Sequence, residues 1–122
     1  MRTMVITKKT EIDLTYPKFV GVIDYIHDNL HNISSVRQIC ENTQVPERTV
    51  QRLINKKYNI SPKIYLNNLR LNEVRKGLKK NSNYSHVFEI ASEYNFWHMG
   101  QFSRDYKRLF GELPSETIKT CN

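Results

Sequence analysis

Residues 38–62 read QICENTQVPERTVQRLINKKYNISP, and residues 89–114 repeat the pattern as EIASEYNFWHMGQFSRDYKRLFGELP. The register is kept at apolar, basic and proline positions alike, which indicates one helical pair used twice along the chain. Matched residues of the two copies are 51 positions apart before Trp97 and 52 positions apart after it, so one residue is inserted near Trp97. The matched pairs are Cys40 with Ala91, Val45 with Phe96, Val50 with Phe102, Arg52 with Arg104 and Pro62 with Pro114.

The first copy predicts a short helix, a turn and a second, amphipathic helix. Ser34 or Ser35 caps the short helix, and residues 42–45 form the turn. Pro46 then opens the second helix, which residues 59–61 end. Its inward side chains are expected to be Val50, Leu53 and Ile54, and its outward ones Arg48, Thr49, Gln51, Arg52, Asn55 and Lys56.

The second copy predicts the same order of elements. Ser85 caps a short helix, residues 94–97 form the turn, and a helix runs over residues 98–110 with Gly111 as the residue that ends it. The outward side chains are expected to be Gln101, Ser103, Arg104, Lys107 and Arg108, and the inward ones Phe102, Tyr106, Leu109 and Phe110. We expect Trp97 to pack in the core beside Phe96, in preference to an exposed wedge against a sugar-phosphate backbone.

The flanking segments complete an all-α chain. Apolar spacing predicts a helix from Phe19 to Leu30, and Pro62 opens a long bridging helix over residues 62–80, with Tyr65, Leu66, Leu69, Val74 and Leu78 as its inner stripe. A short helix follows Pro114. We therefore expect seven helices forming a pair of helix-turn-helix subdomains joined by the bridging helix. The expected divisions are a tail or linker stub over residues 1–16 and one domain over residues 17–122, containing the pairs at about 34–57 and 84–110.

Charge indicates a polyanionic partner. The chain of 122 residues carries 19 Lys and Arg against 12 Asp and Glu, a net charge of +7. Residues 1–33 hold four basic and four acidic side chains, so the whole excess lies from residue 34 onward, on the duplicated part. Nucleic acid is the leading candidate. The alternative is a solvated basic surface without a specific partner.

Other features exclude several classes. Two cysteines, Cys40 and Cys121, do not make a disulfide framework, so a reducing cytoplasm is expected. Cys40 occupies a small, packed position of the repeat, which favours packing over catalysis. Four histidines show no paired spacing with a cysteine, so we expect no metal and no cofactor. Without a long apolar run we expect no membrane partner, and without a glycine-rich phosphate loop or a catalytic triad we expect no enzyme.

The second helix of each copy carries groups that can read DNA bases. Arginine pairs with guanine and glutamine with adenine, whereas serine and threonine hydroxyls serve a base or a phosphate. A surface ion pair is the alternative for Arg52 and Arg104. The expected base contacts are Arg48, Thr49, Gln51, Arg52, Met99, Gln101, Ser103 and Arg104. The expected phosphate contacts are Ser35, Lys56, Lys57, Ser85, His98, Lys107 and Arg108.

Residues 96–117, FWHMGQFSRDYKRLFGELPSET, resemble the C-terminal signature of the AraC/XylS family of bacterial transcription regulators, with support from residues 45–71. The resemblance covers about residues 20–117. It implies that residues 47–57 and 98–107 are recognition helices, which enter successive major grooves on one face of promoter DNA. Gln44 and Asn95 depart from the family pattern at the two turns, but Asn tolerates a left-handed backbone. Met99 and Gly100 are poor hydrogen-bond donors at the start of the second recognition helix.

These observations predict a sequence-specific regulator, an activator by expectation, that reads an asymmetric promoter site on double-stranded DNA as a monomer. RNA polymerase and an upstream sensor domain are further candidate partners. The chain is either a short activator that stands alone or the C-terminal piece of a longer protein, and the neutral first 33 residues favour the piece. The alternative function is a helical protein-interaction module without specific DNA readout.

Overall fold

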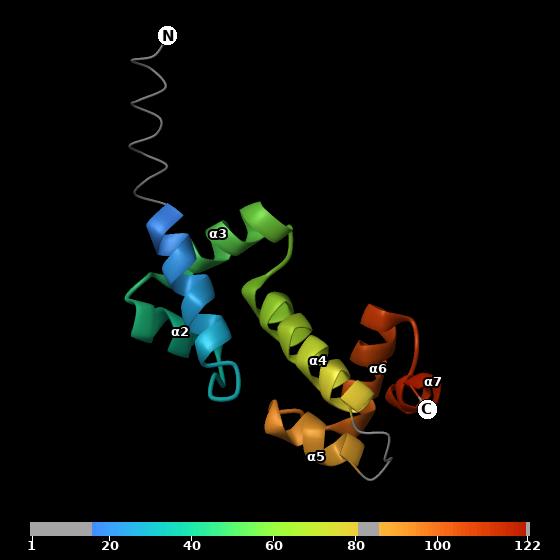
Figure 1. Ribbon diagram of the computed structural model, residues 1–122. Coiled ribbons are helices and arrows are strands. Elements are labelled where there is room, and N and C mark those ends of the chain that lie inside the picture. The colour runs from blue at the N-terminus through green and yellow to red at the C-terminus, as the bar shows by residue number, and fades with distance from the viewer. Residues whose placement is uncertain (1–15, 81–85, 122) are drawn as a thin grey trace, which may run out of the picture. The chain divides into compact units, whose positions relative to one another are not determined.

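The computed structural model describes residues 16–80 and 86–121, and every regular element within these ranges is helical (Figure 1). The seven helices predicted are present. They are an unlabelled helix over residues 16–28, α2 (Val36–Thr43), α3 (Glu47–Tyr58), α4 (Pro62–Lys80), α5 (His86–Glu93), α6 (Met99–Phe110) and α7 (Pro114–Cys121). The expected all-α class is confirmed. Ser85, the rest of the break between α4 and α5, and residues 1–15 of the expected tail lie outside the described residues.

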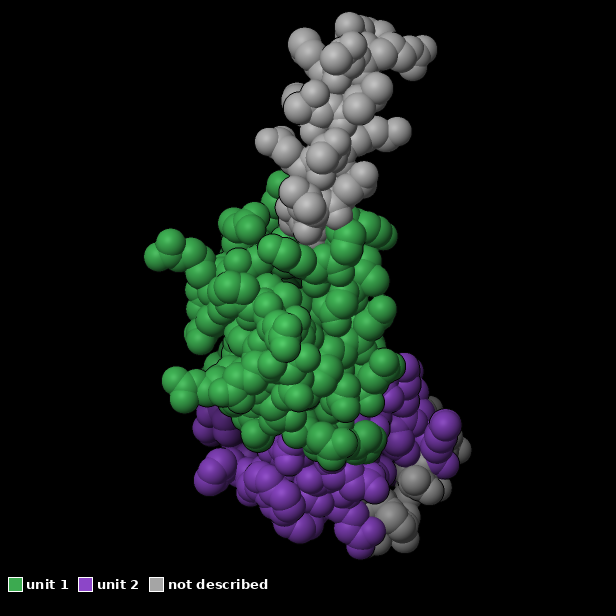
Figure 2. Space-filling view, turned by 90° about the vertical axis from the view of Figure 1, so that its left-hand side faces the viewer, with its two compact units in different colours: residues 1–65 green, residues 66–122 purple. Residues whose placement is uncertain are grey.

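The chain divides into two compact units, residues 1–65 and residues 66–122 (Figure 2). α4 begins in the first unit and continues into the second. The division falls inside the predicted bridging helix, so each unit contains one copy of the repeat.

The first unit holds the helix over residues 16–28 together with α2 and α3. Its core consists of aliphatic side chains from all three helices and from the segments between them: Val22, Ile26, Leu30, Ile33, Ile39, Val45, Val50, Leu53 and Ile54. The first helix starts earlier than Phe19 and ends before Leu30, because residues 29–32 form a turn in which the Ile33 amide donates to the Asn29 carbonyl at 3.1 Å. Tyr58 stacks on Tyr65 with ring centroids 4.7 Å apart, which packs the end of α3 against the start of α4.

In the second unit, α5, α6 and α7 gather around the C-terminal half of α4 (Figure 1). The core joins Leu71, Val74 and Leu78 of α4 to side chains of the other three helices and of the segment between α5 and α6: Ile90, Ala91, Phe96, Phe102, Tyr106 and Ile118. Gly77 permits close approach of α5, since a Cβ added there would lie 3.1 Å from Ile90 Cγ2.

Three expectations about inward side chains are wrong. Trp97 is 62% exposed and Leu109 is 39% exposed. The inner stripe of α4 includes Leu71, which is 1% exposed, whereas Leu69 is only half-buried. Trp97 lies outside because its neighbour Phe96 takes the core position, where the rings of Phe96, Phe102 and Tyr106 contact in series.

Candidate nucleic-acid interface

The two turns that precede α3 and α6 have the same backbone geometry. Gln44 and Asn95 both adopt the left-handed conformation, with φ of 58° and 69°. The Val45 amide donates to the Cys40 carbonyl at 3.2 Å, and the Phe96 amide donates to the Ala91 carbonyl at 3.1 Å. These positions are the ones that the repeat pairs at a separation of 51, so the duplication seen in the residues is also a duplication of the helix-turn-helix turn.

We call α3 and α6, which correspond to the expected recognition helices, the first and second reading helices. In α3, Val50, Leu53 and Ile54 are buried, which leaves a polar outer face that carries the predicted contacts. Glu47 in its first turn and Lys56 and Lys57 in its last turn complement the helix dipole. The exposed side chains of α3 are Glu47, Arg48, Gln51, Arg52, Asn55, Lys56, Lys57 and Tyr58, and Thr49 is half-buried at the edge of this face.

The basic side chains of α3 are available to a partner. Within the described residues no hydrogen bond or ion pair engages the guanidinium groups of Arg48 and Arg52. Gln51 donates weakly to Glu47 Oε2 at 3.4 Å. The surface ion pair considered for Arg52 is therefore absent among the described residues.

α6 is the second reading helix, and Phe102 and Tyr106 anchor it in the core. The predicted contacts Gln101, Arg104, Lys107 and Arg108 are exposed, whereas Met99 and Ser103 are half-buried. His98 is the N-terminal cap residue by position, but its side chain makes no capping hydrogen bond. Gly111 ends the helix in the left-handed conformation, as expected.

The polar side chains of α6 are linked to one another. Gln101 Nε2 donates to Asp105 Oδ1 at 2.8 Å, and Arg104 Nη2 donates to Gln101 Oε1 at 3.0 Å. Asp105 Oδ1 also accepts from Arg108 Nη1 at 3.3 Å, and Asp105 Oδ2 accepts from Asn67 Nδ2 of α4 at 3.4 Å. We call these five residues the Asp105 network. Sequence reasoning missed Asp105 and Asn67, although the spacing of four between Gln101 and Asp105 was a usable signal.

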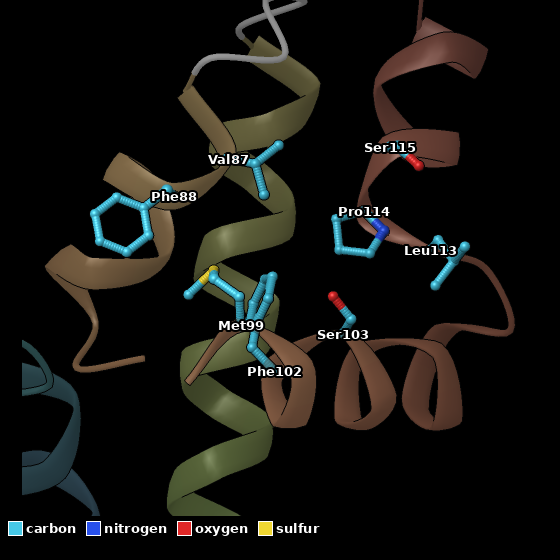
Figure 3. A pocket seen from close by; sticks show the side chains of 8 residues that line it. All are labelled: Val87, Phe88, Met99, Phe102, Ser103, Leu113, Pro114 and Ser115. Atoms are coloured by element: carbon cyan, nitrogen blue, oxygen red, sulfur yellow. The ribbon is translucent and has the colours of Figure 1, made fainter. Parts of the chain in front are cut away.

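An apolar cavity of about 510 Å³ lies beside the second reading helix (Figure 3). Ser103 points into it, toward Leu113 and Pro114 (Figure 3). Its hydroxyl therefore lies at the edge of the reading face, next to α7. The lining residues are Val87, Phe88, Met99, Phe102, Ser103, Leu113, Pro114 and Ser115.

The predicted phosphate contacts stand on the surface where the structure describes them. Lys56, Lys57 and Lys107 are exposed, as is Ser35, whose hydroxyl accepts from the Gln38 amide at 3.3 Å as the cap of α2. Ser34 and Ser35 were both candidates for the cap of this helix, and the structure has Ser35 in that position.

Other chemistry has little support in the described ranges. Cys40 is a free thiol there, and burial raises its pKa, which favours the unreactive protonated form. Residues 16–80 and 86–121 contain no group of three or more histidine, cysteine or acidic side chains placed to hold a metal ion. No helix among them is long and apolar enough to cross a membrane.

The comparisons with known proteins agree with this geometry. Residues 39–120 match the family model described as a helix-turn-helix domain. The chain is 35% identical over 106 residues to the XylDLEGF operon transcriptional activator of Pseudomonas putida, covering 86% of this chain and 33% of that protein. It is 31% identical over 99 residues to a probable thc operon regulatory protein of Rhodococcus erythropolis, covering 80% of this chain and 30% of that protein. The chain thus spans about a third of the length of these relatives.

A solved structure supports the fold. The crystal structure of an AraC-type transcriptional regulator from Chromobacterium violaceum superposes with a TM-score of 0.78 at 24% identity, covering 87% of this chain and 93% of that one. The duplicated turn and the two exposed reading helices define a helix-turn-helix protein of the DNA-binding class. The chain belongs to the AraC/XylS family of transcription regulators. This family is a class of regulators and not of enzymes.

Proposed function

We propose that this chain reads a promoter site with both reading helices, in successive major grooves of one duplex. α3 contributes base contacts from Arg48, Thr49, Gln51 and Arg52, and α6 contributes them from Met99, Gln101, Ser103 and Arg104. The observation that carries the proposal is the pair of matched turns, each followed by an exposed, basic helix whose other face is buried. The match to a helix-turn-helix family supports DNA as the partner that these helices bind.

Phosphate contacts supply most of the affinity in this proposal. They come from Ser35, Lys56, Lys57, Ser85, His98, Lys107 and Arg108, together with the basic outer side of α4 around Lys79 and Lys80. Because the two reading faces differ in sequence, the site is asymmetric. We further propose that the intact protein works in the cytoplasm as an activator, with RNA polymerase and an upstream sensor domain as its protein partners. Two features support this part: the activator names of relatives and the threefold greater length of those relatives.

The test is selection of bound duplexes from a randomised pool by the purified chain, followed by salt titration of the enriched duplex. We expect an enriched asymmetric site, and an affinity that falls linearly with the logarithm of salt concentration. Failure to enrich any sequence would contradict the proposal and favour the protein-interaction module.

A further inference from the structure

The second reading helix holds its arginine in place, whereas the first leaves its arginines free. Arg104 donates to Gln101 Oε1 at 3.0 Å, and Gln101 in turn donates to Asp105 Oδ1 at 2.8 Å. Within the described residues no such partner holds Arg48 or Arg52. The two copies therefore differ in whether a neighbouring side chain holds the arginine, although each helix carries one carboxylate, Glu47 in α3 and Asp105 in α6.

The chemistry of the neighbours fixes the orientation of the Gln101 amide. An ionised carboxylate only accepts hydrogen bonds, and a guanidinium only donates them. Placed between Asp105 and Arg104, the amide must turn its nitrogen to Asp105 and its oxygen to Arg104. One N–H and one oxygen lone pair of Gln101 are thereby bonded, so reading adenine with this amide would compete with its bonds to Asp105 and Arg104.

Asp105 is suited to anchor this arrangement. Its side chain is only 17% exposed, so it lies under the reading face. Asn67 of α4 donates to its second oxygen at 3.4 Å, which ties the carboxylate to the core helix of the same unit. Arg108 adds a third donor at 3.3 Å. The partial burial and the three donors fix the carboxylate, and its charge is met by Arg108.

We propose that Asp105 and Gln101 are positioning residues that hold the Arg104 guanidinium ready for one base pair. Arg104 is then the base contact within the Asp105 network, and Gln101, one of the base contacts proposed above, acts through Arg104 instead. The inference rests on the proposed function and divides the residues of the second reading helix by role. A guanidinium that is already oriented loses less side-chain freedom on binding, so the preference for the correct base is larger. Asp105 therefore lowers affinity for any DNA while raising discrimination.

The experiment compares Asp105→Asn with Glu73→Gln as a matched control. Each change neutralises one carboxylate that forms an ion pair three residues away, Asp105 with Arg108 and Glu73 with Lys76, but only Asp105 belongs to the network. Dissociation constants are measured for the duplex enriched by the wild-type chain and for a scrambled duplex of the same composition. We expect Asp105→Asn to lower the ratio of the two affinities about tenfold, without weakening binding to the scrambled duplex. Glu73→Gln is expected to leave the ratio unchanged.

Position-resolved selection completes the test. Pools selected by Gln101→Ala, Asp105→Asn and Arg104→Ala are expected to lose their preference at the same base pair. Loss at a different base pair for Gln101→Ala would overturn the inference, because Gln101 would then read a base itself. An unchanged ratio for Asp105→Asn, or equal weakening on both duplexes, would also overturn it. A wild-type chain that enriches no sequence overturns the proposed function itself, and this inference with it.

Discussion

Trp97 exposes an indole ring directly before the second reading helix. It lies between α5 and α6, in residues 96–98, which form no regular element. Phe96 takes the inward side at 9% exposure, so Trp97 is turned outward. An exposed aromatic ring beside a reading helix is suited to contact with a sugar-phosphate backbone, which was the less favoured of the two expectations for this residue.

We expect Trp97→Ala to weaken binding to enriched and scrambled duplexes alike, about fivefold, because backbone contact carries no sequence information. The free energy of unfolding should change by less than about 0.5 kcal/mol, since little packing is lost. Fluorescence binding titrations and chemical denaturation measure the two effects. The control Phe96→Ala removes a buried ring and should cost about 3 kcal/mol or more. A comparable loss of stability in Trp97→Ala would contradict the exposed position.

Tyr106 is buried, and its hydroxyl lies 2.6 Å from Thr117 Oγ1. Thr117 itself donates to Glu112, so Tyr106 is the donor in the first bond. Burial raises the pKa of Tyr106, against smaller lowering effects from Thr117 and Arg75. The neutral phenol is thus favoured in the folded state. Tyr106 contributes fully to stability below a pH of about 10, the pKa of a tyrosine in the unfolded chain. This contribution is lost as the pH rises through the higher pKa that Tyr106 has in the folded state.

We therefore expect Tyr106→Phe to lower the free energy of unfolding by about 1 kcal/mol at neutral pH, through loss of the hydrogen bond. Above about pH 10 the difference in unfolding free energy between wild type and variant should narrow. The phenol then ionises in the unfolded wild type, which stabilises that unfolded state, and the variant has no such group. Urea denaturation at several pH values measures the gap. The control is Tyr16→Phe, where the ring is 61% exposed, and it should follow the wild type throughout. A gap that widens with pH would be incompatible with the burial described.

At the scale of the element, α3 and α4 separate two kinds of DNA contact. Arg52 stands exposed on the reading helix without a partner in the described residues, and Lys80 ends the bridging helix, also exposed. We expect Arg52→Ala to lower discrimination between enriched and scrambled duplexes about tenfold. Lys80→Ala should weaken both equally and reduce the salt slope by about one. Competition binding at several salt concentrations measures both. Equal behaviour of the two variants would leave α3 without a reading role.

The end of α6 depends on one backbone conformation. Gly111 has φ of 77°, and its amide donates to the Lys107 carbonyl at 2.8 Å. Space is not the constraint, since an added Cβ would meet nothing within 4 Å. We expect Gly111→Ala to cost about 1 kcal/mol from the left-handed conformation alone. Gly21, also in open space but inside a helix, is the control: Gly21→Ala should stabilise by roughly 0.5–1 kcal/mol. Thermal denaturation of the two variants measures these changes in stability. A loss of stability in both variants would reject the conformational explanation.

At the scale of the whole molecule, two units of similar plan are connected through α4. A helix of 19 residues is about 28 Å long at 1.5 Å per residue. In the proposed complex each unit enters one of two major grooves, which lie about 34 Å apart along the duplex. We expect a monomer to protect about two turns of duplex, in an asymmetric footprint. Footprinting together with the mass of the complex measures this, and protection of a single groove, or a dimer on a palindrome, would contradict it.

The residues alone predicted most of the fold, because the repeat combined apolar spacing with caps and turn residues. Gly111 was assigned from backbone preference and has the expected conformation, and Ser35 was one of two candidate caps. The left-handed backbone of Asn95 was expected from the family pattern and is also present. The predicted base and phosphate contacts remain predictions. Where the structure describes them, their side chains lie on or at the edge of the reading faces. This much could be predicted, because the helical spacing that buries the apolar side chains of a helix also turns its polar side chains outward.

Local pattern determined the seven helices, their order and the polar faces of α3 and α6, since hydrogen bonding and apolar spacing within one helix depend on near neighbours. Tertiary packing decided which of several aromatic rings is inside. Phe96 and Trp97 are adjacent and both aromatic, and the contact of Phe96 with Phe102 in the core assigns Phe96 to the inside and Trp97 to solvent. The Asp105 network was decided in the same way, because Asn67 and Asp105 are 38 residues apart and meet only when α6 packs on α4.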